Sequence, residues 1–207
     1  MSRQKSPDSI DSRIVAAIHG RGRGAVFVPA DFLQIGSRKA VDVVLHRLAR
    51  LGTIRRLARG VYDLPEEHLV LGPLLPSAEV VARALARRDR TRLQPAGAYA
   101  ANTLGLTEQV PAKAVFLTDG PAKRVTIGPL TIQLRRTTPR NMEAAGRLSG
   151  LLIQAFRELG PEQITPERRE HLKRSIPLEK RKELLKDLRL AATWMQSIFR
   201  ELAEEQA

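Results

Sequence analysis

Residues 36–63 read GSRKAVDVVLHRLARLGTIRRLARGVYD, and this stretch decides the expected fold of the N-terminal part. Ser37 is a suitable N-cap for an amphipathic helix that ends near Gly52. The runs Thr53–Leu57 and Gly60–Asp63 are β-prone and predict a hairpin. The helix would bury the apolar residues that recur at helical spacing: Ala40, Val41, Val44, Leu45, Leu48 and Leu51.

A helix, a loop and a short strand are expected before this stretch. Three isoleucines share one face of the first helix, for which Ser9 or Asp8 is a suitable N-cap. A GRGRG loop at 20–24 follows, and then an apolar run at 25–28. A short turn-like helix separates this run from the longer helix. This order is typical of a winged helix-turn-helix, so we expect such a DNA-binding domain over residues 1–64.

Positive charge is concentrated in the first two thirds of the chain, whose net charge is +13 over 207 residues. Residues 1–64 hold 12 Lys/Arg against 5 Asp/Glu, and residues 65–140 hold 11 against 6. Residues 141–207 are nearly balanced, with 12 against 11. The first two segments are therefore suited to face a polyanion, and the third is typical of mixed-charge, solvated helices.

The start of the 37–51 helix carries the side chains best suited to read DNA. Arg38 and Lys39 lie where a recognition helix meets base edges, and the arginine fork matches the paired acceptors of guanine. Ser37 and the free N–H groups of the helix start suit a phosphate. The same face carries Asp42, Val43, His46 and Arg50. The alternative is that this is simply a solvated helix face without a binding role. The arginine-rich hairpin that follows the helix disfavours this alternative.

Arginines on the hairpin and in the glycine loop are expected to contact the DNA backbone. Strand alternation places Arg55 on one face and Arg56 on the other. We expect Arg55 and Arg59 to contact phosphates, and Arg56 to pair within the domain. Arg21 and Arg23 resemble a minor-groove arm, although flexible backbone contacts are an equal alternative.

The remaining chain predicts an α+β domain over residues 77–207, after a linker at 65–76 that contains three prolines. Its strands would form a small antiparallel sheet, with helices at the C-terminal end. Residues 141–159 carry one apolar stripe, and a final helix is expected from Pro177 to about Glu205.

The final helix would carry a narrow apolar seam with heptad-like spacing. Two interpretations are open: a homodimer interface that matches two half-sites on DNA, or packing on the 141–159 helix of the same chain. The second is favoured because that helix needs a partner. The seam consists of Leu184, Leu188, Ala191, Met195, Ile198 and Leu202.

Catalytic, metal and cofactor motifs are not evident, so we expect no enzyme activity, no metal and no cofactor. The four histidines lack metal-ligand spacing, and the glycine loop precedes a strand, whereas a dinucleotide-binding fingerprint follows one.

Cysteine is absent, which excludes disulfides. No signal-peptide core or apolar run of about 20 residues occurs, so we expect a cytoplasmic protein without membrane contact. The few aromatic residues disfavour RNA binding by stacking.

Several of these segments together resemble the AbiEi-like antitoxin family of abortive-infection (type IV) toxin–antitoxin systems. The resemblance covers roughly Ser9 to Gly160. In the N-terminal part it rests on Gly36-Ser37-Arg38, Ala40-Val41-Asp42, Leu48, Gly52, Ile54, Arg56-Leu57, Arg59-Gly60 and Tyr62. In the second part it rests on residues 95–102 (PAGAYAAN), 104–106 (LGL), 115–120 (VFLTDG) and 135–140 (RRTTPR).

The resemblance implies a bacterial repressor of its own operon that binds inverted repeats in double-stranded DNA. It also implies a second domain that counters a nucleotidyltransferase-like toxin, without a stable complex in the family. The C-terminal helices do not match the family. Two alternatives therefore stay open: a regulator with no toxin partner, and a toxin-neutralising interaction module with incidental DNA binding. The protein would be a monomer or a homodimer.

Overall fold

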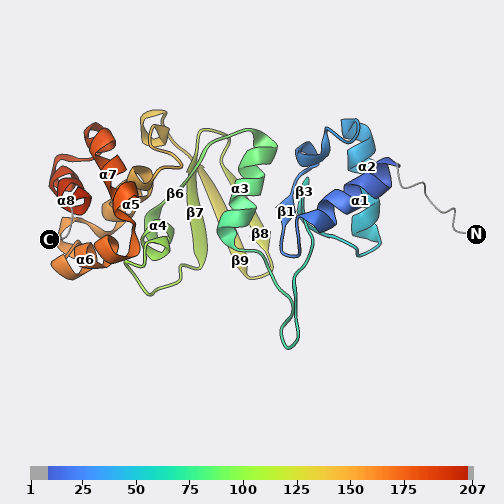
Figure 1. Ribbon diagram of the computed structural model, residues 1–207, viewed down its shortest axis with the longest axis horizontal. Coiled ribbons are helices and arrows are strands. Elements are labelled where there is room, and N and C mark those ends of the chain that lie inside the picture. The colour runs from blue at the N-terminus through green and yellow to red at the C-terminus, as the bar shows by residue number, and fades with distance from the viewer. Residues whose placement is uncertain (1–8, 205–207) are drawn as a thin grey trace, which may run out of the picture. The chain divides into compact units, whose positions relative to one another are not determined.

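The computed structural model describes residues 9–204 and divides into two compact units, Met1–Arg90 and Thr91–Ala207 (Figure 1). Helices and small sheets occur in both units, so the predicted α+β class is confirmed. Within residues 9–204, no helix is both long enough and apolar enough to cross a membrane.

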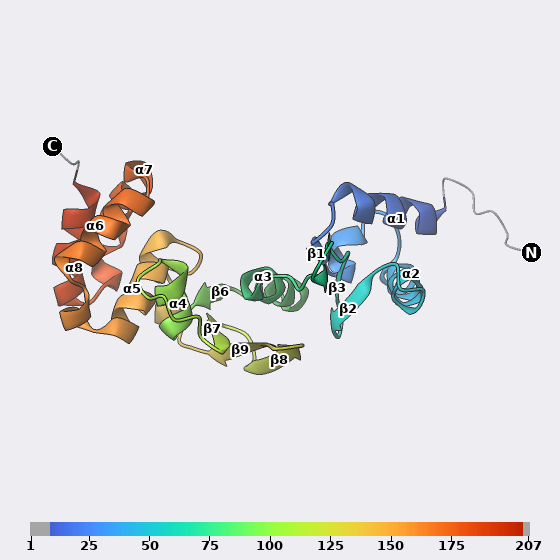
Figure 2. The same ribbon diagram turned by 90° about the horizontal axis from the view of Figure 1, so that it is seen from below.

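The first unit is built around a three-stranded antiparallel sheet in the order β1-β3-β2, which Figure 2 shows beside two helices. A second, two-stranded hairpin precedes the last helix. The elements are α1 (Ile10–Gly20), β1 (Val26–Phe27), η1 (Pro29–Phe32), α2 (Arg38–Arg50), β2 (Arg55–Ala58), β3 (Val61–Asp63), β4 (Glu67–His68), β5 (Gly72–Pro73) and α3 (Ala78–Asp89).

Serine N-caps fix the starts of the three helices in this unit. The hydroxyl oxygens of Ser9, Ser37 and Ser77 each accept from a backbone N–H three residues on, at 3.2, 3.4 and 3.4 Å. Each contact satisfies one of the orphan donors of a helix start. The predicted caps at Ser9 and Ser37 are confirmed, and the alternative cap at Asp8 lies outside the described residues.

The apolar face of α2 packs into the core of the first unit, as its spacing predicts. Val41, Val44, Leu45 and Leu48 are buried. Leu51 was expected to be buried with them but is 70% exposed, because the helix ends at Arg50 and Leu51 turns away as its C-cap. The core also contains Ile14, Ile18, Phe27, Phe32, Ile54, Tyr62 and Leu64.

The boundary between the units differs from the expected one. The segment at 65–76, expected to be a linker, contains the β4–β5 hairpin, whose tip at Leu69–Leu71 is exposed. Helix α3, which lies within the range expected for the second domain (77–207), belongs to the first unit. Arg87 Nη2 on α3 donates to the carbonyl oxygen of Val26 at 3.1 Å and thereby ties α3 to β1.

The second unit contains a four-stranded sheet in the order β6-β7-β9-β8, with helices gathered at its C-terminal end (Figure 1). The elements are β6 (Leu93–Pro95), α4 (Gly97–Thr103), β7 (Lys113–Thr118), β8 (Lys123–Ile127), β9 (Leu130–Arg136), η2 (Arg140–Met142), α5 (Leu148–Leu159), η3 (Pro161–Gln163), α6 (Pro166–Ser175), α7 (Leu178–Lys182), η4 (Glu183–Leu190) and α8 (Thr193–Ala203).

The prediction of a purely antiparallel sheet is wrong, because β7 and β9 pair in parallel. Strand β8 turns back through Gly128-Pro129 to pair with β9 only. Its first four residues alternate between partly exposed and exposed, which suits an edge strand, and Ile127 at its end is buried. The buried residues Ile132 and Leu134 favour the central place that β9 takes.

The expected long C-terminal helix is broken into α7, η4 and α8, and its expected end near Glu205 lies outside the described residues. Ala191 and Ala192 adopt extended backbone conformations between η4 and α8. The apolar seam nevertheless forms one cluster with residues of α5. The preferred interpretation, packing within the chain, is therefore confirmed, and the seam is not available as a dimer interface.

Candidate nucleic-acid interface

The outward face of α2 is exposed and carries the residues that the sequence predicts to read DNA. Its apolar side is held by the core, so the opposite side is fixed in direction. Val43, at the centre of this face, is 60% exposed. Around Val43 the surface forms a shallow depression, lined by Arg38, Lys39, Asp42, Val43, His46, Arg47 and Arg50.

Arg38 is held in place by the carboxylate one turn along α2. Its Nε donates to Asp42 Oδ1 and Oδ2 at 3.1 and 3.0 Å, and both side chains are about half exposed. Within residues 9–204, no hydrogen bond engages the two terminal nitrogens of Arg38. The pair therefore orients the guanidinium and leaves two donors for a further acceptor. Asp42 acts here as a positioning group.

Arg47, which lines the same depression, connects α2 to α1. Its Nη2 lies 2.6 Å from Asp11 Oδ2. This ion pair fixes the orientation of one helix relative to the other. Sequence reasoning did not assign Arg47 a role, since the partner comes from a different element.

Arg55 does not face solvent as a phosphate contact requires, and this prediction is wrong. Its Nε and Nη2 donate to Asp63 Oδ1 and Oδ2 at 3.1 and 2.5 Å, and Nη2 also donates to the carbonyl oxygen of Leu74 at 2.7 Å. Asp63 is 1% exposed, so its charge needs this partner. Arg56, expected to pair inside the domain, is the exposed one.

Arg59 is exposed at the turn of the β2–β3 hairpin, where sequence reasoning placed it. Its carbonyl oxygen accepts a hydrogen bond from Arg88 Nη1 of α3, which fixes the turn. The exposed arginines of this hairpin are therefore Arg56 and Arg59.

The two loop arginines, predicted to form a minor-groove arm, are exposed and make contacts within their own unit. The guanidinium of Arg21 lies over the Phe32 ring, 5.1 Å from its centroid, and its Nη1 is 3.6 Å from Asp31 Oδ2. Arg23 Nη1 donates to the carbonyl oxygen of Pro65 at 3.2 Å. Both arginines are exposed, so these contacts leave the side chains accessible to solvent.

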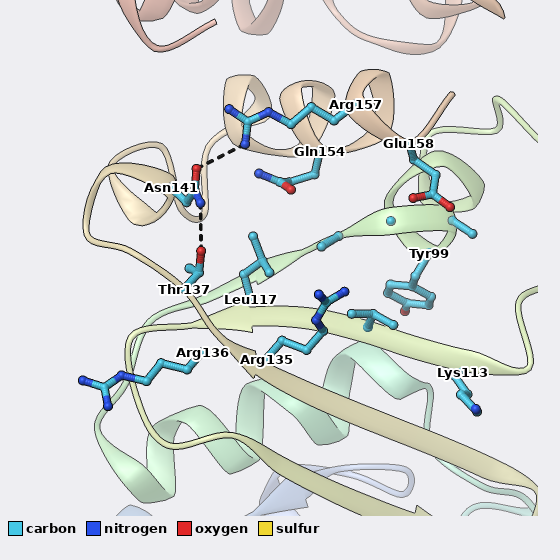
Figure 3. A pocket seen from close by; sticks show the side chains of 14 residues that line it. Tyr99, Lys113, Leu117, Arg135, Arg136, Thr137, Asn141, Gln154, Arg157 and Glu158 are labelled. Atoms are coloured by element: carbon cyan, nitrogen blue, oxygen red, sulfur yellow. Dashed lines mark hydrogen bonds between the residues drawn. The ribbon is translucent and has the colours of Figure 1, made fainter. Parts of the chain in front are cut away.

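A second basic site lies entirely within the second unit. A cavity of about 500 Å³ lies between α5 and the β7–β9 pair (Figure 3). It is lined by Ala96, Gly97, Ala98, Tyr99, Lys113, Val115, Leu117, Arg135, Arg136, Thr137, Asn141, Gln154, Arg157 and Glu158. Sequence reasoning missed this site because its residues come from several distant segments. Two of its segments, 95–102 and 135–140, were distinguished in the sequence only by the family resemblance.

An ion pair outside the cavity ties β6 to the end of β7. Arg92 donates to Asp119 through its backbone N–H and its Nε, both at 2.8 Å. The side-chain hydrogen bond from Arg92 lowers the pKa of Asp119 below its usual value of 3.8. Asp119 therefore has a structural partner at the turn that follows β7.

Comparison with protein families matches residues 13–184 to the family of unknown function DUF6088. The chain belongs to this family. No curated protein matches significantly. Among solved structures, the crystal structure of the RV2827C protein from Mycobacterium tuberculosis matches with 17% sequence identity and a TM-score of 0.45. The match covers 100% of this chain and 85% of that chain.

The DUF6088 match spans most of both units. It includes the α2 face and also every residue that lines the cavity. Within residues 9–204 of this DUF6088 chain, no cluster of His, Asp and Glu is arranged to hold a metal ion. The α2 face and the basic cavity both lie within the matched residues and carry several charged side chains.

Proposed function

We propose that the protein is a sequence-specific, double-stranded DNA-binding transcriptional regulator, and that its first unit is a winged helix-turn-helix. The order α1, β1, η1, α2, β2, β3 supports this proposal, with η1 as the short first helix of the motif and β2–β3 as the wing. The observation that carries it is the outward face of α2, exposed and basic at its first turn.

The residues of this face have distinct proposed roles. Arg38 and Lys39 contact base edges in the major groove, and Arg38 uses the two nitrogens that Asp42 leaves open. The capped start of α2 at Ser37 receives a phosphate. Farther along the helix, contacts with the groove come from Val43, His46 and Arg50.

The wing supplies contacts that do not depend on sequence. Arg56 and Arg59 are exposed on β2 and its turn, and they take the phosphate role first assigned to Arg55. Each phosphate that such a side chain neutralises releases counterions, so the affinity falls steeply as salt rises.

A gel-shift titration of the full chain tests these roles on the DNA upstream of its own gene and on a scrambled duplex. Arg38→Ala reduces the preference for the upstream DNA, because it removes a base contact worth roughly 1–3 kcal/mol of discrimination. Arg59→Ala weakens binding to both duplexes alike and lowers the salt slope by about one. If Arg38→Ala leaves both affinity and preference intact, α2 is not the reading helix.

We further propose that this regulator is the antitoxin of a type IV toxin–antitoxin pair in the bacterial cytoplasm. It would repress its own operon and counter a nucleotidyltransferase-like toxin encoded beside it. Support comes from the resemblance at 95–102, 115–120 and 135–140, segments that fold together in the second unit around β6, α4, β7 and β9.

Co-expression with the adjacent gene separates this proposal from its alternatives. A double variant, Arg38→Ala with Lys39→Ala, loses DNA binding but still rescues growth from the toxin if the second unit carries the antitoxin activity. If the adjacent gene is not toxic, the protein is a regulator without a toxin. If rescue persists and the wild-type chain does not bind its upstream DNA, it is a toxin-neutralising module.

Binding to inverted repeats would place two copies of the chain on one operator. The apolar seam cannot join them, because Leu184, Met195 and Leu202 are buried within a single chain. We therefore propose that the free protein is a monomer and that pairing occurs on DNA. Sedimentation of the chain alone and with the operator measures the stoichiometry.

A further inference from the structure

The cavity of the second unit has the charge of an anion-binding site. Four cations line it, Lys113, Arg135, Arg136 and Arg157, against one carboxylate, Glu158. In Figure 3, Arg135 reaches from β9 toward Tyr99, whereas Arg136 extends away from it. Within residues 9–204, no hydrogen bond or ion pair engages the guanidinium of Arg135. An anion in the cavity would therefore find a cation that has no competing partner.

Arg157 is held at the Asn141 end of the cavity by a chain of hydrogen bonds. Its Nη1 donates to Asn141 Oδ1 at 3.2 Å, and Asn141 Nδ2 donates to Thr137 Oγ1 at 2.9 Å. Figure 3 shows this chain at one end of the cavity. This hydrogen bond holds Nη1, and the other guanidinium nitrogens of Arg157 can donate to a ligand oxygen.

The side chain of Gln154 offers a ligand neutral hydrogen-bonding groups in addition to the positive charges of the cavity. Gln154 is only 8% exposed, and Figure 3 shows its amide directed from α5 into the cavity. Within the described part of the chain, no hydrogen bond satisfies this amide. Because no buried side-chain nitrogen or oxygen of the described residues lacks a partner, the amide atoms of Gln154 are open to the cavity, where they can offer a ligand both a donor and an acceptor.

The walls between these polar groups are apolar and rigid. Val115 and Leu117 project from alternate positions of β7. The ring of Tyr99 lies 5.0 Å from that of Phe116, centroid to centroid, which fixes its place. The volume of about 500 Å³ lies within the range of small-molecule sites. An inorganic anion alone would leave most of this space unfilled.

We propose that this cavity binds a nucleotide that carries a 5′-phosphate. Arg135 and Arg157 hold the phosphate, and Gln154 hydrogen-bonds the edge of the base, which packs beside Tyr99. The nucleotide is either free or the 5′ end of a strand, since both present the same phosphate and base. This proposal uses no residue of α2, so it stands independently of duplex DNA binding.

Isothermal titration of the full chain tests the proposal with AMP, GMP, CMP and UMP, their triphosphates, inorganic pyrophosphate and a 5′-phosphorylated trinucleotide. At least one nucleotide or the trinucleotide is expected to bind with a Kd below about 1 mM. Binding of the trinucleotide without any free nucleotide assigns the strand end as the source. The absence of saturable binding by every nucleotide and by the trinucleotide overturns the proposal.

Variants locate the binding to this cavity. Arg135→Ala and Arg157→Ala each weaken the affinity roughly tenfold or more, since each removes a charge-assisted hydrogen bond. Arg124→Ala is the matched control, because Arg124 is an exposed arginine of the same sheet that does not line the cavity. Equal losses of affinity in all three variants would show that nucleotides bind through non-specific electrostatic attraction, and this would contradict the proposed site.

The amide separates nucleotide recognition from anion capture. Gln154→Leu keeps the approximate side-chain volume and is expected to weaken nucleotide binding while leaving pyrophosphate binding unchanged. Circular dichroism confirms that the variant is folded. If pyrophosphate binds as tightly as every nucleotide in the wild-type chain, the base is not recognised and the proposal is wrong.

Discussion

Adjacent arginines on strand β2 have opposite environments, and their replacement provides a matched test of the structure. Arg55 pairs with Asp63, which is 1% exposed, whereas Arg56 faces solvent. Arg55→Ala leaves a buried carboxylate without its partner. Arg56→Ala removes an exposed side chain of the same type one residue away. The two variants therefore separate structural support from DNA contact.

The expected loss of stability follows from the burial of the pair. Removing one partner of a buried ion pair costs about 3–5 kcal/mol. Arg55 is itself 28% exposed, so water reaches part of the site and the lower end, about 3 kcal/mol, applies. For a unit of this size, that corresponds to a fall in Tm of roughly 12 °C or more. Arg56→Ala changes the stability by no more than about 0.5 kcal/mol.

Thermal unfolding followed by far-ultraviolet circular dichroism measures this difference, and hydrogen exchange over residues 54–64 localises it. DNA affinity is measured at a temperature where both variants are folded. Arg56→Ala is expected to weaken binding to all duplexes, and folded Arg55→Ala to bind nearly as wild type. If Arg55→Ala keeps full stability and loses DNA affinity, the Arg55–Asp63 pairing is wrong and the original phosphate assignment holds.

Three further predictions concern the second unit. Gly150→Ala lowers the free energy of unfolding by about 1–3 kcal/mol, as overpacking does, because its Cβ would lie 2.2 Å from the carbonyl oxygen of Ala144. A wild-type urea midpoint would contradict this close approach. Arg181→Met lowers the urea midpoint of unfolding, because Arg181 is buried and donates to backbone carbonyls at the end of α8. If the hydrogen exchange of the α8 amides is unchanged in this variant, Arg181 does not hold the end of α8. The pKa of Asp119 is lower in the folded chain than its usual value of 3.8. Its ion pair therefore stabilises the fold above about pH 3.8, and this stabilisation is lost as the pH falls through the folded-state pKa. Asp119→Asn should therefore be less stable than wild type at neutral pH, with a difference that narrows under acid; a difference independent of pH would contradict the ion pair with Arg92.

Local patterns in the sequence were sufficient to predict the first unit's main elements. Helix α2 begins after Ser37 and ends at Arg50, close to the predicted bounds, because capping and apolar period act within a few residues. The same pattern placed the exposed face on the correct side of this helix. Helix caps and apolar periodicity depend only on residues close together in the chain, so they can be recognised without knowledge of the fold.

Contacts between distant segments were the source of the errors. Alternation correctly separated Arg55 from Arg56 but did not say which one points inward, because this depends on Asp63 across the hairpin. The parallel pairing of β7 with β9 was also missed, because it depends on which strands become neighbours in the folded sheet. The basic cavity escaped notice because Gln154 and Arg135 come together only in three dimensions.

The central claim, that α2 lies in the major groove, is tested most directly by cleavage from a reagent on this helix. The chain contains no cysteine, so Val43→Cys provides a single attachment point at the centre of the face for an iron chelate that cleaves DNA. Val110→Cys, at an exposed valine of the second unit, is the control. Cleavage from position 43 is expected to be confined to about one helical turn of the bound duplex. If the Val43→Cys conjugate still binds the duplex but cleaves no more locally than the control, α2 does not read DNA.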